Sequence, residues 1–209
     1  MLQLTDYKKY YGSKLIIEST GYEFREGLHW VKGENGSGKT TLFKSLAGLL
    51  PFDGAISLLE CVLKNQPDQY RLSVNYAEAE PVFPPMVKGS DLMRLYEKYK
   101  QATIGQAEEI CETLGINFLD ETFDTYSSGM GKKLSILLAL LGQPKVVLLD
   151  EPLVTLDVKS VEAMLHLISL YRSRYNTTFL ISSHQAFEKG TIQPDYIHLV
   201  ANGTICGQN

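Results

Sequence analysis

The residues with the clearest chemical potential lie in one glycine-rich stretch, GENGSGKTT, which runs from Gly33 to Thr41. Its first eight residues fit the phosphate-loop pattern G-x-x-x-x-G-K-[ST], in which backbone amides surround anionic oxygens. Lys39 would reach the β- and γ-phosphates of a nucleotide, and the Thr40 hydroxyl would bind Mg²⁺. The alternative is an ordinary glycine turn with a solvated lysine. The apolar LHWV before the loop and the helical leucine spacing in KTTLFKSLAGL after it favour the phosphate loop.

Two adjacent carboxylates, Asp150 and Glu151, follow the apolar run VVLL within KVVLLDEP. Parallel sheets bind ligands at the carboxyl ends of their strands, so we expect this pair beside the phosphate loop. Asp150 would hold Mg²⁺ directly or through water, and Glu151 would polarise a water for attack on the γ-phosphate. Without the loop, a solvated acidic strand end would be the better interpretation.

His184 ends a second apolar run, TTFLISSH, and is expected at the same edge of the sheet. There its imidazole would hydrogen-bond the γ-phosphate or the attacking water, although a lone histidine is more often structural. No such context surrounds His29, His166 or His198, which we interpret as structural or surface residues.

The elements that must position these side chains follow an α/β order. LQLTDY and SKLIIEST predict early antiparallel strands, GAISLL and YRLSVNY predict further strands, and the three prolines of AEAEPVFPP predict a loop. Residues from 88 to about 124 are polar and helical in pattern. Apolar strands then alternate with helices, which indicates a parallel sheet, and Asn-Gly near the C-terminus predicts a final hairpin.

Composition limits the classes of function. The chain has 209 residues, a formal charge of −4 and 44% hydrophobic residues, which is typical of a globular protein and argues against a nucleic-acid coat. Its three cysteines are isolated and odd in number, so the sequence shows neither a zinc motif nor a full disulfide framework. No run reaches the roughly 18 apolar residues of a membrane span.

The order of the motifs resembles that of ATP-binding cassette (ABC) ATPases. In that family a signature, LSGGQ, precedes a helix and then the aspartate–glutamate strand. Here YSSGM, from Tyr126 to Met130, takes the signature positions, and Gly129 precedes Asp150 by 21 residues. Alone, this pentapeptide would be a plain helix cap. In this order, however, it supports the resemblance, which covers nearly the whole chain.

The resemblance implies a set of site residues. Glu151 and His184 would be catalytic, while Thr40, Asp150 and Glu78 would bind the metal. ATP would contact Tyr11, Gly33, Glu34, Asn35, Gly36, Ser37, Gly38, Lys39, Thr40 and Thr41. Ser127, Ser128 and Gly129 would act on the ATP of a second subunit, and Asp157 would lie in the loop that couples the two sites.

Alternatives and departures accompany these assignments. Tyr10 is the alternative to Tyr11 as the aromatic that stacks on adenine, and a core tyrosine is nearly as good an interpretation. The family usually has a glutamine where this chain has Glu78, or alternatively Glu80. A carboxylate there would still bind Mg²⁺ but adds charge beside the γ-phosphate. The altered signature and this carboxylate together raise the possibility of slow hydrolysis.

The resemblance implies a single α/β P-loop domain over 1–209 with a RecA-like core, an N-terminal antiparallel β portion and an inserted helical subdomain. The core with its β portion would span 1–86 and 143–209, and the helical subdomain 87–142. ATP and Mg²⁺ would be bound between two subunits, with a homodimer as the simplest case. We expect no nucleic-acid partner. The chain would be cytoplasmic and would reach the inner face of the membrane only through a transmembrane permease.

Two other functions stay open. One is a soluble ABC ATPase that drives a process other than transport, and the other is a weakly hydrolysing, nucleotide-sensing regulatory subunit. A P-loop GTPase is disfavoured, because the sequence has no N-K-x-D guanine motif.

Overall fold

The structure is a computed structural model that describes residues 1–184 and 193–208. Among these residues, ten strands form one mixed sheet in the order β5-β4-β1-β2-β10-β9-β3-β8-β7-β6. The strands are β1 Leu2–Tyr11, β2 Lys14–Phe24, β3 Leu28–Lys32, β4 Asp53–Leu58, β5 Cys61–Val62, β6 Val74–Ala77, β7 Val146–Leu149, β8 Thr178–Ser183, β9 Tyr196–Ala201 and β10 Thr204–Gln208. The helices are α1 Lys39–Leu46, α2 Pro67–Ser73, α3 Gly89–Lys100, α4 Gln106–Leu114, the 3₁₀ helix η1 Phe123–Thr125, α5 Ser128–Leu140 and α6 Val158–Tyr175.

The centre of the sheet is parallel. Strand β3 pairs in parallel with β8 and β9, and β7 lies in parallel between β8 and β6. All four residues of β7 are buried, as expected for an apolar strand covered on both faces. The carboxyl ends of β3, β6, β7 and β8 therefore meet at one edge. This arrangement confirms the predicted α/β fold with a parallel core.

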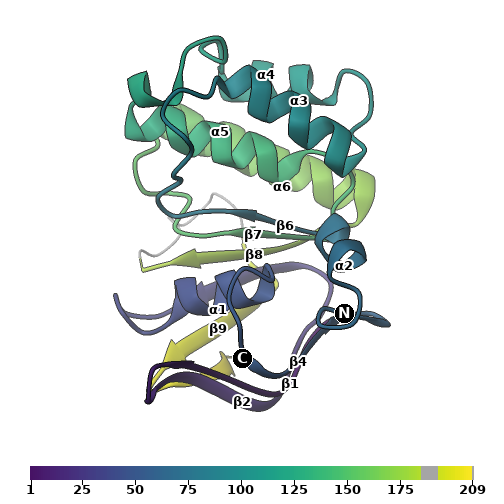
Figure 1. Ribbon diagram of the computed structural model, residues 1–209, viewed down its shortest axis with the longest axis vertical. Coiled ribbons are helices and arrows are strands. Elements are labelled where there is room, and N and C mark those ends of the chain that lie inside the picture. The colour runs from purple at the N-terminus through teal and green to yellow at the C-terminus, as the bar shows by residue number, and fades with distance from the viewer. Residues whose placement is uncertain (185–192, 209) are drawn as a thin grey trace.

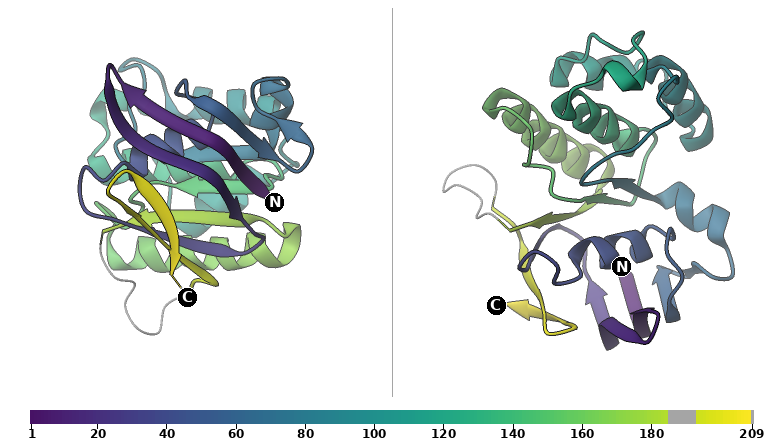
Figure 2. Two further views of the ribbon diagram at one scale, coloured as in Figure 1. Left: turned by 90° about the horizontal axis from the view of Figure 1, so that it is seen from below. Right: turned by 60° about the vertical axis from the view of Figure 1, so that its left-hand side comes forward.

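The N-terminal strands form the predicted antiparallel portion, in which β1 pairs with both β2 and β4. Helix α1 lies between this portion and β8 (Figures 1 and 2). Its side chains Leu42, Phe43 and Leu46 are fully buried in a core that includes Leu4 and Ile56. Because α1 is enclosed in this way, its N-terminus is held at the edge where β3 ends.

Helices α4, α5 and α6 cover the other face of the sheet, over β6, β7 and β8, with α3 and α4 outermost (Figure 1). Residues Leu134 and Leu138 of α5 share one hydrophobic core with Ile110 of α4, Ile168 of α6 and Val147 of β7. Helices from the 87–142 region thus pack on the same core as the sheet. The boundaries of a separate helical subdomain stay a prediction.

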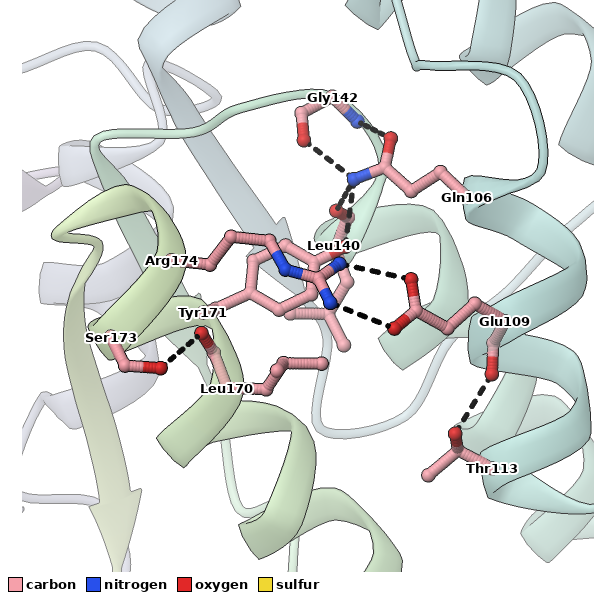
Figure 3. A network of polar contacts seen from close by, with 9 residues as sticks. All are labelled: Gln106, Glu109, Thr113, Leu140, Gly142, Leu170, Tyr171, Ser173 and Arg174. Carbon is pink, nitrogen blue, oxygen red and sulfur yellow. Dashed lines mark hydrogen bonds and ion pairs between the residues drawn. The ribbon is translucent and has the colours of Figure 1, made fainter.

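A buried amide ties α4 to its neighbours (Figure 3). The Gln106 side chain donates to the Tyr171 hydroxyl at 2.8 Å and to the Gly142 carbonyl at 2.7 Å, and it accepts from the Gly142 N–H at 3.0 Å. Nearby, Arg174 on α6 binds both carboxylate oxygens of Glu109 at 3.0 and 3.2 Å. Helix α4 is therefore fixed to α6 by directed polar contacts as well as by apolar packing.

The strand predicted over YRLSVNY is only partly present. Its first half is the end of α2, and only Val74–Ala77 form a strand, β6. Pro67 begins α2, where its missing N–H costs no helical hydrogen bond. The Tyr70 hydroxyl donates to the Leu46 carbonyl at 2.8 Å, which anchors α2 on α1. The predicted C-terminal hairpin is confirmed, with Asn202 and Gly203 both at positive φ between β9 and β10.

Candidate functional site

The loop between β3 and α1 is shaped to present backbone amides. Gly36 and Gly38 have φ angles of 80° and 108°, which disfavour residues with a β-carbon. Gly38 caps α1, which begins at Lys39 and has no acidic residue in its first turn. The positive end of α1 therefore faces this loop.

A pocket of ≈ 400 Å³ lies at this helix end. From the loop and α1 it is lined by Asn35, Gly36, Gly38, Lys39, Thr40 and Thr41. The other residues predicted to contact the nucleotide, Gly33, Glu34 and Ser37, do not line this pocket. The Ser37 hydroxyl oxygen is buried and has no hydrogen-bond partner among the described residues. Free amides, a buried ammonium and an unpaired hydroxyl fit a polyphosphate.

Lys39 is the charged centre of the pocket and is 5% exposed. Its ammonium donates to the carbonyl oxygens of Gly33 at 2.7 Å and Glu34 at 3.2 Å. It also lies 3.4 Å from Glu151 Oε1. The structure thus brings together the lysine and the glutamate predicted from separate motifs.

Asp150 follows β7 and is fully buried. Its carboxylate accepts hydrogen bonds from the Ser182 hydroxyl at 2.5 Å and from the Tyr76 hydroxyl at 3.1 Å. Burial and the neighbouring Asp150 carboxylate raise the pKa of Tyr76 above its ordinary value, so this hydroxyl stays a donor. Asp150 does not line the pocket, which suits contact with a metal through an intervening water better than direct contact.

Glu151 lines the pocket from the end of β7 and has a positive φ of 45°. Its backbone N–H donates to the Ser182 hydroxyl oxygen at 2.8 Å, and its Oε2 lies 3.0 Å from His184 Nδ1. His184 follows β8 and lines the same pocket. Glu151, His184 and Lys39 therefore converge on one space, from the end of β7, the end of β8 and the start of α1.

The two candidate carboxylates after β6 separate in space. The Glu78 carboxylate lies 3.6 Å from Lys44 Nζ and does not line the pocket, whereas Ala79 and Glu80 do. Of the two candidates, Glu80 lines the pocket and Glu78 contacts Lys44, and a metal-binding role for either residue stays a prediction. In this loop the Glu78 N–H donates to the Ser135 hydroxyl on α5, at 3.1 Å.

Tyr11, at the end of β1, lines the pocket and is 52% exposed. The alternative, Tyr10, does not line it. Lys9 places its ammonium 4.9 Å from the centre of the Tyr11 ring. An exposed ring beside a phosphate-shaped loop fits a planar base.

The predicted signature residues lie apart from this pocket. Ser127 caps α5 by accepting from the Met130 N–H at 3.2 Å, and Ser128 and Gly129 form the first turn of the helix. Asp157 caps α6, where hydrogen bonds from the Ser160 backbone and hydroxyl lower the pKa of its carboxyl group. None of these four residues lines the pocket.

Three residues near the site were not found from the sequence: Tyr76, Ser182 and Lys132. Ser182 had a signal, since it lies two residues before His184 in the same run, TTFLISSH. Lys132 stands out as a charge within the apolar helix GKKLSILLALL. Tyr76 gave no comparable signal. In the described part of the chain, no helix is both long enough and apolar enough to cross a membrane.

Comparison with known proteins shows which proteins this chain is similar to in sequence and in fold. The chain is 26% identical over 191 residues to the linearmycin resistance ATP-binding protein LnrL of Bacillus subtilis (strain 168), covering 88% of this chain and 61% of that protein. It is 27% identical over 213 residues to the lantibiotic transport ATP-binding protein SrtF of Streptococcus pyogenes, covering 98% and 89%. The fold matches a dimeric structure of the ATP-binding cassette MJ0796 bound to ADP and Pi, with a TM-score of 0.85, 16% identity and coverage of 100% and 98%.

The chain spans about 60% of the length of several relatives that it matches, including LnrL. The family described as ABC transporter matches residues 23–154, which include the phosphate loop, the signature positions and the Asp150–Glu151 pair. This match covers more than half of the chain and shows that the protein belongs to the ABC transporter family of ATP-binding proteins.

Proposed function

We propose that this chain is the ATP-binding and ATP-hydrolysing subunit of a transporter, and that two such subunits close around ATP to power a separate membrane permease. The observation that carries the proposal is the convergence of Lys39, Glu151 and His184 on one pocket beside the N-terminus of α1. The relative SrtF, which the chain matches along nearly its whole length, is described as a lantibiotic transport ATP-binding protein.

In this proposal the loop amides and Lys39 bind the phosphates, and Tyr11 stacks on the adenine. Thr40, Asp150 and Glu80 are the residues that would hold Mg²⁺. When bound, Mg²⁺ neutralises charge on the phosphate oxygens. The Tyr76 and Ser182 hydroxyls fix the position of the Asp150 carboxylate, since both donate to it.

Glu151 accepts a proton from the water that attacks the γ-phosphorus. The new bond joins the water oxygen to phosphorus, the bond to the β-phosphate oxygen breaks, and ADP leaves with the electron pair. His184 lies 3.0 Å from the Glu151 carboxylate and orients it toward the pocket. The Lys39 ammonium lies 3.4 Å from the other oxygen of this carboxylate, Oε1.

The separation within one chain supports the pairing of two subunits. Ser127 and Ser128 are exposed at the N-terminus of α5 but do not line the pocket of their own chain. Their amides and hydroxyls suit an anion, so a second copy is the natural source of that anion. The dimeric MJ0796 structure, which shares the fold, supports this arrangement.

A second groove, of ≈ 400 Å³, gives the permease a place to dock. Leu49, Leu95 and Tyr99 line it and are 55%, 60% and 46% exposed, an apolar surface that suits a cytoplasmic segment of a membrane protein. Glu78 also lines this groove, and Glu80, two residues on, lines the nucleotide pocket. Contact in the groove would therefore reach the pocket through one short loop. The chain would be cytoplasmic and peripheral at the inner face of the membrane.

The test is Glu151→Gln in the full chain. We expect ATP to bind with little change, because polarity at the position is kept, while turnover falls about 100- to 10,000-fold because the base is lost. Calorimetry measures binding, phosphate release measures turnover, and light scattering measures the expected ATP-stabilised dimer. Glu162→Gln, an exposed carboxylate on α6, is the matched control and should leave all three unchanged. Turnover at the wild-type rate in Glu151→Gln would overturn the proposed role.

A further inference from the structure

Lys132 is a buried ammonium on the same helix that carries the signature residues. It lies in the second turn of α5 and is 1% exposed. Its three N–H groups have three acceptors, all backbone carbonyls: Glu78 at 2.8 Å, Ala79 at 2.5 Å and Asp150 at 3.2 Å. These carbonyls follow β6 and β7, which are parallel neighbours beneath α5 (Figure 1). One side chain thus bridges the signature helix and two strand ends of the site.

The contact with Asp150 fixes the peptide bond that precedes Glu151. Lys132 donates to the carbonyl of this peptide, and the N–H of the same peptide donates to the Ser182 hydroxyl oxygen at 2.8 Å. Glu151 itself has a φ of 45°, a conformation that a non-glycine residue adopts only when its surroundings hold it there. The orientation of the Glu151 side chain therefore depends on both ends of this peptide.

The other two contacts fix the loop that carries Glu80. Helix α5 binds the Glu78 backbone at both its polar groups, the N–H through Ser135 and the carbonyl through Lys132. The Ala79 carbonyl is held by Lys132 as well. Ala79 and Glu80 line the nucleotide pocket, so a movement of α5 would also move these two residues of the pocket lining.

A purely architectural role explains this lysine poorly. Burial lowers the pKa of Lys132 to about 8, and the carboxylates that face it, those of Asp150, Glu151, Glu80 and Glu78, oppose the shift. The residue thus stays charged at neutral pH at a desolvation cost that an apolar side chain would avoid. Its neighbour Lys133, by contrast, donates to the Leu114 carbonyl within the helical layer, away from the pocket.

We propose that Lys132 is a positioning residue that aligns Glu151 for hydrolysis and ties this alignment to the orientation of the signature helix. In the position that α5 has in this structure, the Lys132 ammonium binds both the peptide before Glu151 and the loop that carries Glu80. When α5 rotates, the two are released together. The inference rests on the proposed function of Glu151 as the base.

The experiment compares Lys132→Met with Lys133→Met in the full chain, each with and without Glu151→Gln. We expect Lys132→Met to bind ATP nearly as wild type does, because the phosphate loop is untouched, and to lose about 100-fold in single-turnover hydrolysis, because the base is misplaced. In the Glu151→Gln background the same change should cost less than about threefold, since residues acting as a unit are not additive. Lys133→Met should cost less than about threefold in either background.

The outcomes are separable. Equal losses from Lys132→Met with and without Glu151→Gln would assign the lysine a general structural role and overturn the inference. Hydrolysis at the wild-type rate in Lys132→Met, together with a loss in Glu151→Gln, would overturn the inference alone. Wild-type turnover in Glu151→Gln would overturn the proposed function itself. Circular dichroism verifies folding. If Lys132→Met does not fold, Lys132→Gln replaces it. Its amide has only two N–H donors for the three carbonyls, so turnover should still fall, and wild-type turnover in Lys132→Gln would contradict the inference.

Discussion

The Nζ atom of Lys39 lies 3.4 Å from Oε1 of Glu151, and the two side chains are 6% and 16% exposed. Solvent screens such a pair weakly, so each charge fixes the position of the other. The pair joins the phosphate loop at the end of β3 to the strand end of β7, two parallel strands separated by β8. Binding of phosphates by Lys39 and the position of the Glu151 carboxylate are thereby linked.

Lys39→Ala should weaken MgATP binding about 100-fold. The change removes an ammonium aimed into the pocket, and hydrogen bonds to charged groups contribute about 1.5–3 kcal/mol each. Calorimetry with the full chain measures the dissociation constant. Lys44→Ala, on the same helix but paired with Glu78 outside the pocket, is the control and should bind as wild type does. Equal affinity in the Lys39 variant and wild type would contradict the assignment of the phosphate loop.

Glu80→Gln should have two effects, one on the affinity for ATP without Mg²⁺ and one on the Mg²⁺ concentration that turnover needs. Without Mg²⁺, ATP should bind about fivefold more tightly, because a negative charge facing the pocket is removed, an effect of about 1 kcal/mol. The Mg²⁺ concentration for half-maximal turnover should rise, because a candidate ligand is lost. Titration of Mg²⁺ in a turnover assay measures this shift.

Glu78→Gln is the matched control, because its carboxylate contacts Lys44 rather than the pocket. We expect neither of the two effects in that variant. The reverse result, with Glu78→Gln effective and Glu80→Gln silent, would show that the loop rearranges when nucleotide binds.

How far the sequence predicts the structure depends on the range of the interactions. The phosphate loop, the buried strand VVLL and the Asn-Gly hairpin depend on local chemistry, and all three form where the sequence predicts them. Residues Tyr70–Ser73 form the end of helix α2 instead of the predicted strand. Here the Tyr70 hydroxyl donates to the Leu46 carbonyl on α1, a contact that no local pattern reveals. Helix α2 did have a local signal in Pro67, at its first position.

The site shows the same division. Lys39, Asp150, Glu151 and His184 lie at the ends of recognisable strands or loops, so their types and neighbours were sufficient to find them. The sequence does not predict which of Glu78 and Glu80 faces the pocket, because this depends on the contact between Glu78 and Lys44, which are 34 residues apart in the chain. Lys132 acts through carbonyls more than 50 residues away in the chain, at Glu78 and Ala79.

Acid should destabilise the fold through a buried pair of histidines. His29 Nε2 lies 2.7 Å from the Arg25 carbonyl, which only accepts, so His29 donates there and its Nδ1 accepts from His198 Nε2 at 2.8 Å. His198 Nδ1 then accepts from the Tyr22 hydroxyl at 2.6 Å. This chain of bonds needs both rings neutral. Burial and then the neighbouring His29 lower the pKa of His198 to about 4, and burial lowers that of His29.

The sign of the pH dependence follows from these pKa values. An unfolded histidine takes a proton near pH 6.5, whereas folded His198 does so only near pH 4. The stability from the neutral ring is therefore complete above about pH 6.5 and is lost as the pH falls toward 4, by about 3 kcal/mol for His198. Urea unfolding at pH 7.5 and 5 measures the part of this loss that is complete by pH 5, about 2 kcal/mol. His198→Gln should reduce the difference between the two pH values, and His166→Gln, at an exposed position, should not. An undiminished difference in His198→Gln would assign the acid sensitivity to other groups.

Ser127→Arg tests whether two copies share each site. The variant should fold and bind ATP at its own phosphate loop, because Ser127 lies outside that pocket. It should fail to turn over ATP, because an arginine at the N-terminus of α5 fills the space through which hydroxyl and amides must approach the partner's nucleotide. Phosphate release and calorimetry on the same preparation separate the two effects.

Mixing Ser127→Arg with Lys39→Ala gives the decisive result. The first chain has an intact loop and a damaged signature, and the second has the reverse, so their heterodimer has one doubly damaged interface and one intact interface. If the two sites work independently, the mixture should regain part of the wild-type turnover that neither variant shows alone. If they are strictly cooperative, turnover stays absent, but ATP should still promote crosslinking of cysteines introduced across the intact interface. Folded, mixed chains that give neither turnover nor crosslinking would rule out the shared site, because the intact interface contains every residue that the proposal assigns to it.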